Sequence, residues 1–251
     1  MTSPCILVTN DDGIHAPGLG ILAQALEALG EVWVYAPDRE QSAVGHGVSL
    51  HHPLRVTPFR DRWFMVDGTP TDCVMLAVRD LLRERPALIV SGINPGANLG
   101  DDVTYSGTVA GAYEGMLLGV PSMAVSNVSY APKHLDTAGA VAERVARSIL
   151  EHGLPPETML NVNVPDVPEP ELAGLAITRM GRRHYEDEIV RREDPRGRVY
   201  YWIGGGPPTH HAESGTDLEV VERNLVSVTP LHRDLTNHQA ITYLEQWEFR
   251  P

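Results

Sequence analysis

The sequence predicts an α/β fold built on a mostly parallel sheet with helices on both faces. Short runs rich in β-branched residues alternate with longer segments of helical periodicity between residue 5 and about residue 165, as in consecutive βαβ units. The strand-like runs are almost continuously apolar, which is typical of strands covered on both faces. With 251 residues, 42% of them hydrophobic, the chain is long enough to bury a sizeable core.

The individual elements follow from their hydrophobic patterns. The expected strands share a short apolar run and span residues 5–9, 32–36, 87–91, 120–125 and 159–164, with 63–66 as a weaker candidate. The expected helices share apolar residues at intervals of three or four. They span residues 19–29, 70–83, 107–118 and 136–151. The first of these stops before Gly30, because glycine commonly ends a helix.

The pattern changes after about residue 165. Residues 182–198 hold 11 charged side chains in 17 positions, and the aromatic patch 200–202 follows. Both a protruding hairpin arm and a solvated charged loop fit this stretch, although the aromatic residues favour burial against a second subunit. Glycines and prolines at 204–208 then break the chain, before the strand-like "LVSVTPL" and the helix-like "NHQAITYLEQW".

Charge and composition exclude several classes of partner. The chain has 20 Lys and Arg against 33 Asp and Glu, a formal net charge of −13, which argues against binding to nucleic acid or to an anionic membrane. We expect neither a signal peptide nor a membrane span, since no apolar run approaches about 20 residues. Cys5 and Cys73 lack metal-binding spacing and indicate a reduced, cytoplasmic protein.

Polar side chains gather where the predicted strands end, which is where parallel sheets bind ligands. The residues in these clusters are Asp11, Asp12, Asp38, Ser42, Asn94, Asn98, Asp101 and Asp102. Carboxylate, hydroxyl and amide oxygens suit a hard cation such as Mg²⁺ or Mn²⁺. Adjacent acids such as Asp11 and Asp12 repel each other unless a cation or N–H donors lie between them. The alternative is that one of the two caps the following helix.

A second feature is the glycine-rich stretch "SGINPGANLGDDVTYSGTV", which leads into the helix expected at 107–118. Ser106 or Thr104 is the expected N-cap of this helix. The free N–H groups and hydroxyls at such a helix start suit a phosphate group. The stretch is neither a P-loop nor a dinucleotide-binding fingerprint, and an ordinary turn before a capped helix remains the alternative.

Five stretches in the same order resemble the survival protein SurE family, whose members are metal-dependent phosphatases acting on nucleoside monophosphates. They are "ILVTNDDGIHAPG", "APDREQSAVGHGVSL", "DGTPTDCV", "SGINPGANLGDDVTYSGTVAGAYEG" and "SVTPLHRDLTNH", and they span most of the chain. The resemblance implies a Rossmann-like catalytic core over residues 1–180. It also implies that residues 181–251 form an oligomerisation arm and C-terminal segment of the same domain, through which homodimers or homotetramers assemble.

The resemblance also implies a set of site residues. One divalent metal ion per subunit, Mg²⁺ or Mn²⁺, would be held by Asp11, Asp12, Ser42 and Asn94, and the substrate phosphate would be held by Asn98, Ser106, Gly107 and Thr108. Asp11 and Asp12 are the expected catalytic residues, with Asp11 orienting or deprotonating the attacking water. The implied activity is hydrolysis of nucleoside 5′- and 3′-monophosphates. The alternatives are an exopolyphosphatase acting on short polyphosphate and a non-catalytic nucleotide-binding sensor.

Overall fold

A computed structural model describes residues 3–184, 187–205, 209–210 and 213–247. Within these residues nine strands form one sheet, in the spatial order β3 (Val56–Arg60), β4 (Trp63–Val66), β2 (Glu31–Pro37), β1 (Cys5–Thr9), β5 (Leu88–Pro95), β6 (Ser122–Asn127), β7 (Thr158–Val164), β13 (Leu225–His232) and β8 (Gly174–Ile177). The strands from β4 to β7 in this order are parallel. The predicted α/β fold with a mostly parallel sheet is therefore confirmed.

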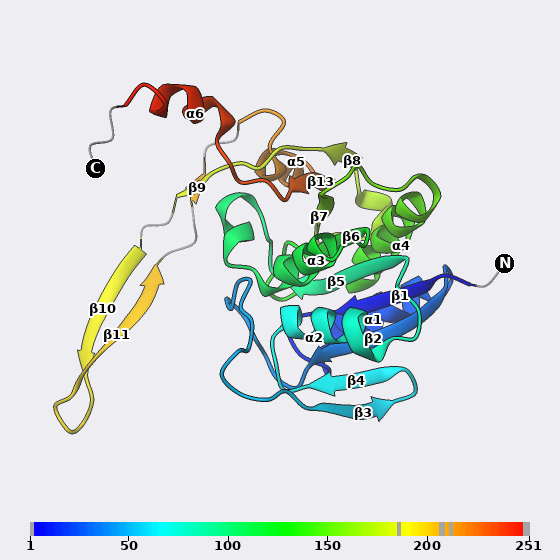
Figure 1. Cartoon of the computed structure of the whole chain (residues 1–251). Coiled ribbons are helices and arrows are strands. Elements are labelled where there is room, and N and C mark those ends of the chain that lie inside the picture. The colour runs from blue at the N-terminus through cyan, green and yellow to red at the C-terminus, as the bar shows by residue number, and fades with distance from the viewer. Residues whose placement is uncertain (1–2, 185–186, 206–208, 211–212, 248–251) are drawn as a thin grey trace.

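Helices cover both faces of the sheet (Figure 1). They are α1 (Pro17–Leu26), α2 (Pro70–Leu76), α3 (Gly107–Leu117), α4 (Leu135–His152) and α5 (Asp217–Glu222). The alternation of side chains along β1 shows how the two faces divide. Ile6 and Val8 belong to the core packed with α1 and α4, whereas Leu7 points to the opposite face and packs with α2. The core is therefore split into two layers by the sheet.

Two edge strands were not expected from the sequence. β3 has mostly exposed residues and no continuous apolar run. β8 is a short apolar stretch, GLAI, whose four residues are also mostly exposed. The helix expected at 70–83 also differs, since it is α-helical to Leu76 and continues as a π-helical turn over Ala77–Leu81. The other three predicted helices are confirmed to within a few residues at each end.

The charged stretch after residue 182 forms an antiparallel hairpin of β10 (Asp187–Glu193) and β11 (Val199–Gly205). Figure 1 shows this hairpin, in yellow, standing clear of the sheet and its helices. A short pair, β9 (Arg183–His184) with β12 (Thr209–His210), lies at its base. The protruding arm, rather than a solvated loop, is therefore the form adopted by the described residues of this stretch.

The C-terminal segment divides between the sheet and the surface. β13 pairs antiparallel with β7 and parallel with β8, so residues beyond the expected boundary at 180 supply a strand inside the sheet. α6 (His238–Leu244) has no buried residue and extends away from the body of the molecule (Figure 1). No helix in the described part of the chain is both long enough and apolar enough to cross a membrane.

Candidate active site

The turn after β1 brings two carboxylates to the carboxyl end of the sheet. Asn10 fixes this turn through a hydrogen bond from Nδ2 to the carbonyl oxygen of Gly13, at 3.0 Å. Gly13 has a φ of +93°, and a Cβ there would lie 3.1 Å from the backbone of Arg39, so glycine is needed at this position. The N–H of Gln41 donates to the carbonyl oxygen of Asp11 at 2.7 Å, which ties the turn to the loop after β2.

A cavity of about 540 Å³ opens at this edge of the sheet. Six of the eight residues expected in the site line it: Asp11, Asp12, Ser42, Asn94, Asn98 and Ser106. They come from the ends of β1, β2 and β5 and from the start of α3. The structure therefore brings together residues that are up to 95 positions apart, from Asp11 to Ser106.

The other two expected residues, Gly107 and Thr108, contact Asp11 from the first turn of α3. The Thr108 hydroxyl donates a hydrogen bond to Oδ1 of Asp11. A Cβ on Gly107 would lie 2.8 Å from Cβ of Asp11 and 2.9 Å from its Oδ2. The lack of a side chain at residue 107 therefore allows the helix start to approach the carboxylate closely.

Both carboxylates are held in an environment that disfavours their charge. Burial raises the pKa of Asp11, and the hydrogen bond from Thr108 offsets this in part. Burial, and then the negative charges of Asp11 and Glu40, raise the pKa of Asp12 to about 7. Two adjacent acids with raised pKa values, Asp11 buried and Asp12 partly buried, are a common mark of a functional site.

The donor set at this edge fits a divalent cation. Oδ2 of Asp12 is buried and has no hydrogen-bond partner in the described part of the chain, which is costly for a carboxylate unless a cation neutralises it. Asn94 uses its Nδ2 to donate to the carbonyl oxygen of Gly96 at 2.8 Å, which leaves Oδ1 as a ligand atom. Since no three His, Cys, Asp or Glu side chains gather in a metal-binding group within the described residues, the hydroxyl and amide oxygens are needed to complete the set.

The residues expected to bind phosphate are held by their own hydrogen bonds. Ser106 is the N-cap of α3, and its Oγ accepts from the N–H of Val109 at 3.0 Å. Asn98 is fixed by Asn163, which accepts from its backbone N–H at 2.9 Å, and by Ser126, which accepts from its Nδ2 at 2.8 Å. The first N–H groups of α3 have no partner within the helix and suit an anion.

Two alternatives left open by the sequence are resolved. Neither Asp11 nor Asp12 caps the next helix, since the N-cap of α1 is Ala16 and has no side-chain hydrogen bond. Ser106 rather than Thr104 caps α3, because the Thr104 hydroxyl donates to the carbonyl oxygen of Asp101 instead. The carboxylate pair thus has no structural role as a helix cap.

Sequence reasoning missed three residues that line the same cavity, namely Glu40, Tyr105 and Tyr130. Glu40 accepts a hydrogen bond from the Ser42 hydroxyl at 2.9 Å, and its place two residues before Ser42 was a usable signal. Tyr105 immediately precedes the N-cap of α3, whereas Tyr130 follows the end of β6 and shares no motif with the rest of the site. Only the folded structure brings Tyr130 to this cavity.

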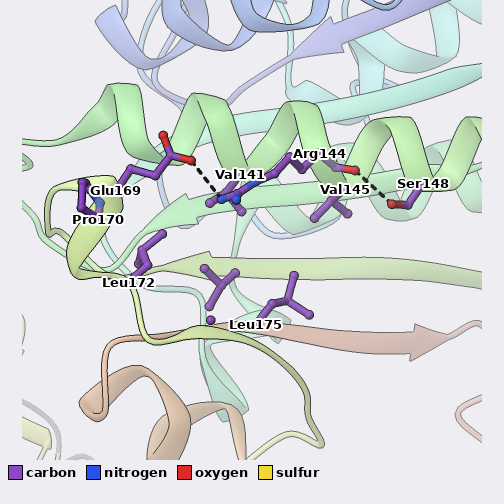
Figure 2. A pocket seen from close by; sticks show the side chains of 10 residues that line it. Val141, Arg144, Val145, Ser148, Glu169, Pro170, Leu172 and Leu175 are labelled. Atoms are coloured by element: carbon purple, nitrogen blue, oxygen red, sulfur yellow. Dashed lines mark hydrogen bonds and ion pairs between the residues drawn. The ribbon is translucent and has the colours of Figure 1, made fainter.

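Two other cavities lack the carboxylate pair. A cavity of about 580 Å³ lies between α4 and β8 (Figure 2), and it is lined mainly by apolar side chains. Its Arg144 and Glu169 pair with each other at 3.5 Å, and none of the residues expected in the site lies in it. A third cavity, of about 510 Å³, shares Ser106 with the carboxylate cavity and is lined by residues of α3 and β13.

Comparisons with known proteins agree with this geometry. The family model described as "Survival protein SurE" matches residues 6–187. A protein of Geobacter sulfurreducens named 5′-nucleotidase SurE is 54% identical over 97% of this chain and 93% of its own length, and its namesake from Geobacter metallireducens is 54% identical over 97% of each. A solved structure titled "Crystal Structure of Sure Protein from Aquifex aeolicus" has a TM-score of 0.86 and 44% identity, over 96% of this chain and all of that one.

Proposed function

Because the chain belongs to the survival protein SurE family, we propose that it is a divalent-metal-dependent phosphomonoesterase that hydrolyses nucleoside 5′- and 3′-monophosphates. Relatives that are 54% identical over nearly its whole length are named 5′-nucleotidase SurE, and this similarity supports a nucleotidase directly. The observation that carries the metal requirement is Oδ2 of Asp12, which is buried and has no hydrogen-bond partner among the residues that the structure describes. It lies in the same cavity as Asp11, Ser42 and Asn94.

Each expected residue has a role in this reaction. Asp11, Asp12, Ser42 and Asn94 would hold one Mg²⁺ or Mn²⁺ ion. The ion would act as a Lewis acid on the phosphoryl oxygens. The hydroxyls and N–H groups at the start of α3, together with the Asn98 side chain, would bind the remaining phosphoryl oxygens and share the negative charge that phosphoryl transfer must spread.

We assign to Asp11 the role of accepting a proton from the attacking water. Its carboxylate is buried and lines the cavity, so it can accept a proton from a water held there. The water oxygen bonds to phosphorus as the ester P–O bond breaks, Asp11 accepts the water proton, and the nucleoside oxygen takes a proton from solvent. The Thr108 hydroxyl keeps the carboxylate oriented through its hydrogen bond to Oδ1.

The arm and the C-terminal helix support a homo-oligomer. The hairpin exposes Ile189, Trp202 and Ile203, which are 67, 65 and 84% exposed, and α6 exposes further apolar side chains. Exposed apolar surface of this kind is typical of contacts between subunits, so we propose a homodimer or homotetramer formed through these segments. The free thiols of Cys5 and Cys73 support a cytoplasmic location.

The test is phosphate release by the wild-type protein and the Asp12→Asn variant. The substrates are AMP, GMP, their 3′ isomers and tripolyphosphate, each with Mg²⁺, Mn²⁺ or EDTA. We expect metal-dependent phosphate release from the wild-type protein. Removal of an outer-shell partner of a metal ligand lowers activity by roughly 10- to 100-fold, and we expect the Asp12→Asn variant to lose more than that. Asp61→Asn is the control, because the Asp61 side chain is 90% exposed and Asp61 is not among the residues that line the cavity.

The substrate ranking decides between the related activities. Faster release from tripolyphosphate than from any mononucleotide would favour an exopolyphosphatase that uses the same site. Binding of AMP without release under any metal would favour a nucleotide sensor and contradict the proposed function. Full activity of the Asp12→Asn variant would remove the carboxylate pair from the metal site.

A further inference from the structure

We propose that Tyr130 is the residue on which the nucleobase of the substrate stacks, an inference that rests on the proposed nucleotidase function. Tyr130 lines the cavity that holds the carboxylates, and 79% of the residue is exposed. Every base has a π face, so stacking on an aromatic ring binds nucleosides without selecting one base. Tyr130 would therefore distinguish nucleotides from phosphate esters that carry no base.

The tyrosine ring is placed against the strand end that supplies Asn94. A Cβ on Gly96 would lie 2.8 Å from Cε1 and 2.9 Å from Cδ1 of Tyr130, so the ring lies directly on the glycine backbone. Gly96 has a φ of +119° and accepts the Asn94 amide hydrogen bond. The proposed metal ligand and the aromatic ring thus share one short piece of backbone, whereas most of the ring surface remains open to a ligand.

The loop that carries Tyr130 is fixed on both sides. Asn127, at the end of β6, accepts from the N–H of Ser129 at 2.9 Å and donates to the Asp166 carboxylate at 3.1 Å. The same carboxylate accepts from the N–H groups of Lys133 and His134, at 3.0 and 2.9 Å. An anchored loop loses less conformational entropy when a ligand binds to it than a free one does.

The aromatic residues that line the cavity also support binding of the nucleobase. Carboxylate, hydroxyl and amide groups line its inner part and account for a cation and a phosphate. Tyr105 and Tyr130 are its aromatic lining residues, and sites for small ligands commonly combine a few polar groups with such rings. Of the two rings, Tyr130 is the one that rests on the backbone next to Asn94.

The neighbouring cavity is a less suitable place for the base. It is lined by Val109, Ala110 and Tyr113 and shares Ser106 with the carboxylate cavity. The first turn of α3 lies between the two, because Gly107 and Thr108 contact Asp11. A nucleotide with its phosphate beside Asp11 would have to pass around this turn to place its base there.

The experiment compares KM and kcat for AMP with those for ribose 5-phosphate, which lacks the base. For Tyr130→Ala we expect the KM for AMP to rise by about 5- to 150-fold, the equivalent of the roughly 1–3 kcal/mol that base stacking contributes. The ratio of the KM for AMP to the KM for ribose 5-phosphate should rise accordingly. Tyr130→Phe should keep the wild-type ratio, because the ring is retained. Ile177→Ala, which removes a side chain of a residue 72% exposed on β8, is the matched control.

The remaining outcomes would contradict either this proposal or the proposed function. An equal rise in KM for both substrates would mean that Tyr130 supports the loop structurally, which overturns the proposal. An unchanged ratio in Tyr130→Ala, with a changed ratio in Tyr105→Ala or Ala110→Phe, would place the base elsewhere and also overturn it. Failure of the wild-type protein to hydrolyse either substrate would instead contradict the proposed function.

Discussion

The hydroxyl of Thr108 in the first turn of α3 donates a hydrogen bond to Oδ1 of Asp11 at the end of β1. The residues are 97 positions apart, and both are buried. The contact joins the proposed phosphate-binding turn to the proposed metal-binding carboxylates. Movement of either element therefore changes the geometry of both.

Thr108→Val removes the hydroxyl and keeps the side-chain shape. An unpaired buried acceptor costs about 1–3 kcal/mol, and Asp11 loses the group that orients it, so we expect kcat to fall by roughly 10- to 100-fold, as for loss of an outer-shell partner. Thr108→Ser should retain most of the activity because it keeps the hydroxyl. Steady-state kinetics with AMP measures both variants, and equal activity in the two would show that the hydrogen bond does not matter for turnover.

Gly107→Ala tests the close approach of α3 to Asp11. The added methyl group would lie 2.8 Å from Cβ of Asp11, so either the helix or the carboxylate must shift, and we expect kcat/KM for AMP to fall at least tenfold. Gly20→Ala is the control on α1, where a Cβ meets nothing within 4 Å. That substitution should keep activity and raise stability by about 0.5–1 kcal/mol. A fully active Gly107→Ala protein would contradict the tight arrangement.

The raised pKa of Asp12 predicts how pH changes the stability of the metal-free protein. The pKa rises from the ordinary value of 3.8 to about 7 in the folded state, because of burial and then of Asp11 and Glu40. The folded state therefore holds a proton that the unfolded state has lost. Its contribution to stability is fully present below about pH 4 and is lost as pH rises through about 7.

Thermal unfolding in EDTA between pH 4 and 8 measures this loss, and Asp12→Asn should show less of it. A bound cation takes the place of the proton, so Mn²⁺ should raise the melting temperature of the wild-type protein more at pH 8 than at pH 5. At 100 times its dissociation constant, an ion adds about 2.7 kcal/mol. An equal rise in the variant would show that Mn²⁺ binds elsewhere.

The hairpin predicts the effect of a charge on assembly. Ile189 and Ile203 lie opposite each other across β10 and β11, and both are exposed. Ile203→Asp should lower the molar mass measured by light scattering, because a charge is costly in an apolar contact between subunits. Arg192→Asp is the control, because Arg192 lies on β10 three positions after Ile189 and so points to the opposite face of the hairpin. An unchanged mass for Ile203→Asp would place the subunit contact elsewhere.

Hydrophobic periodicity was sufficient for the central elements of the fold. The strands β1, β2, β5, β6 and β7 are buried on both faces, and burial requires a continuous apolar run that can be read directly. β3 and β8 lie at the two edges of the sheet and expose most of their residues. β3 therefore carries no such run, and the apolar run of β8 is only four residues long. β13 has an apolar run, but its place beside β7 depends on a long-range pairing.

The sequence by itself determined the class of fold and the chemical types gathered at the strand ends, because periodicity and turn-forming residues are local properties. It also determined membership of the family, through five ordered motifs. The tertiary structure decided which groups meet. It placed Thr108 on Asp11 and brought Tyr130 onto Gly96. It also left Oδ2 of Asp12 buried with no partner in the described part of the chain. These contacts depend on strand order and loop packing, which no local pattern encodes.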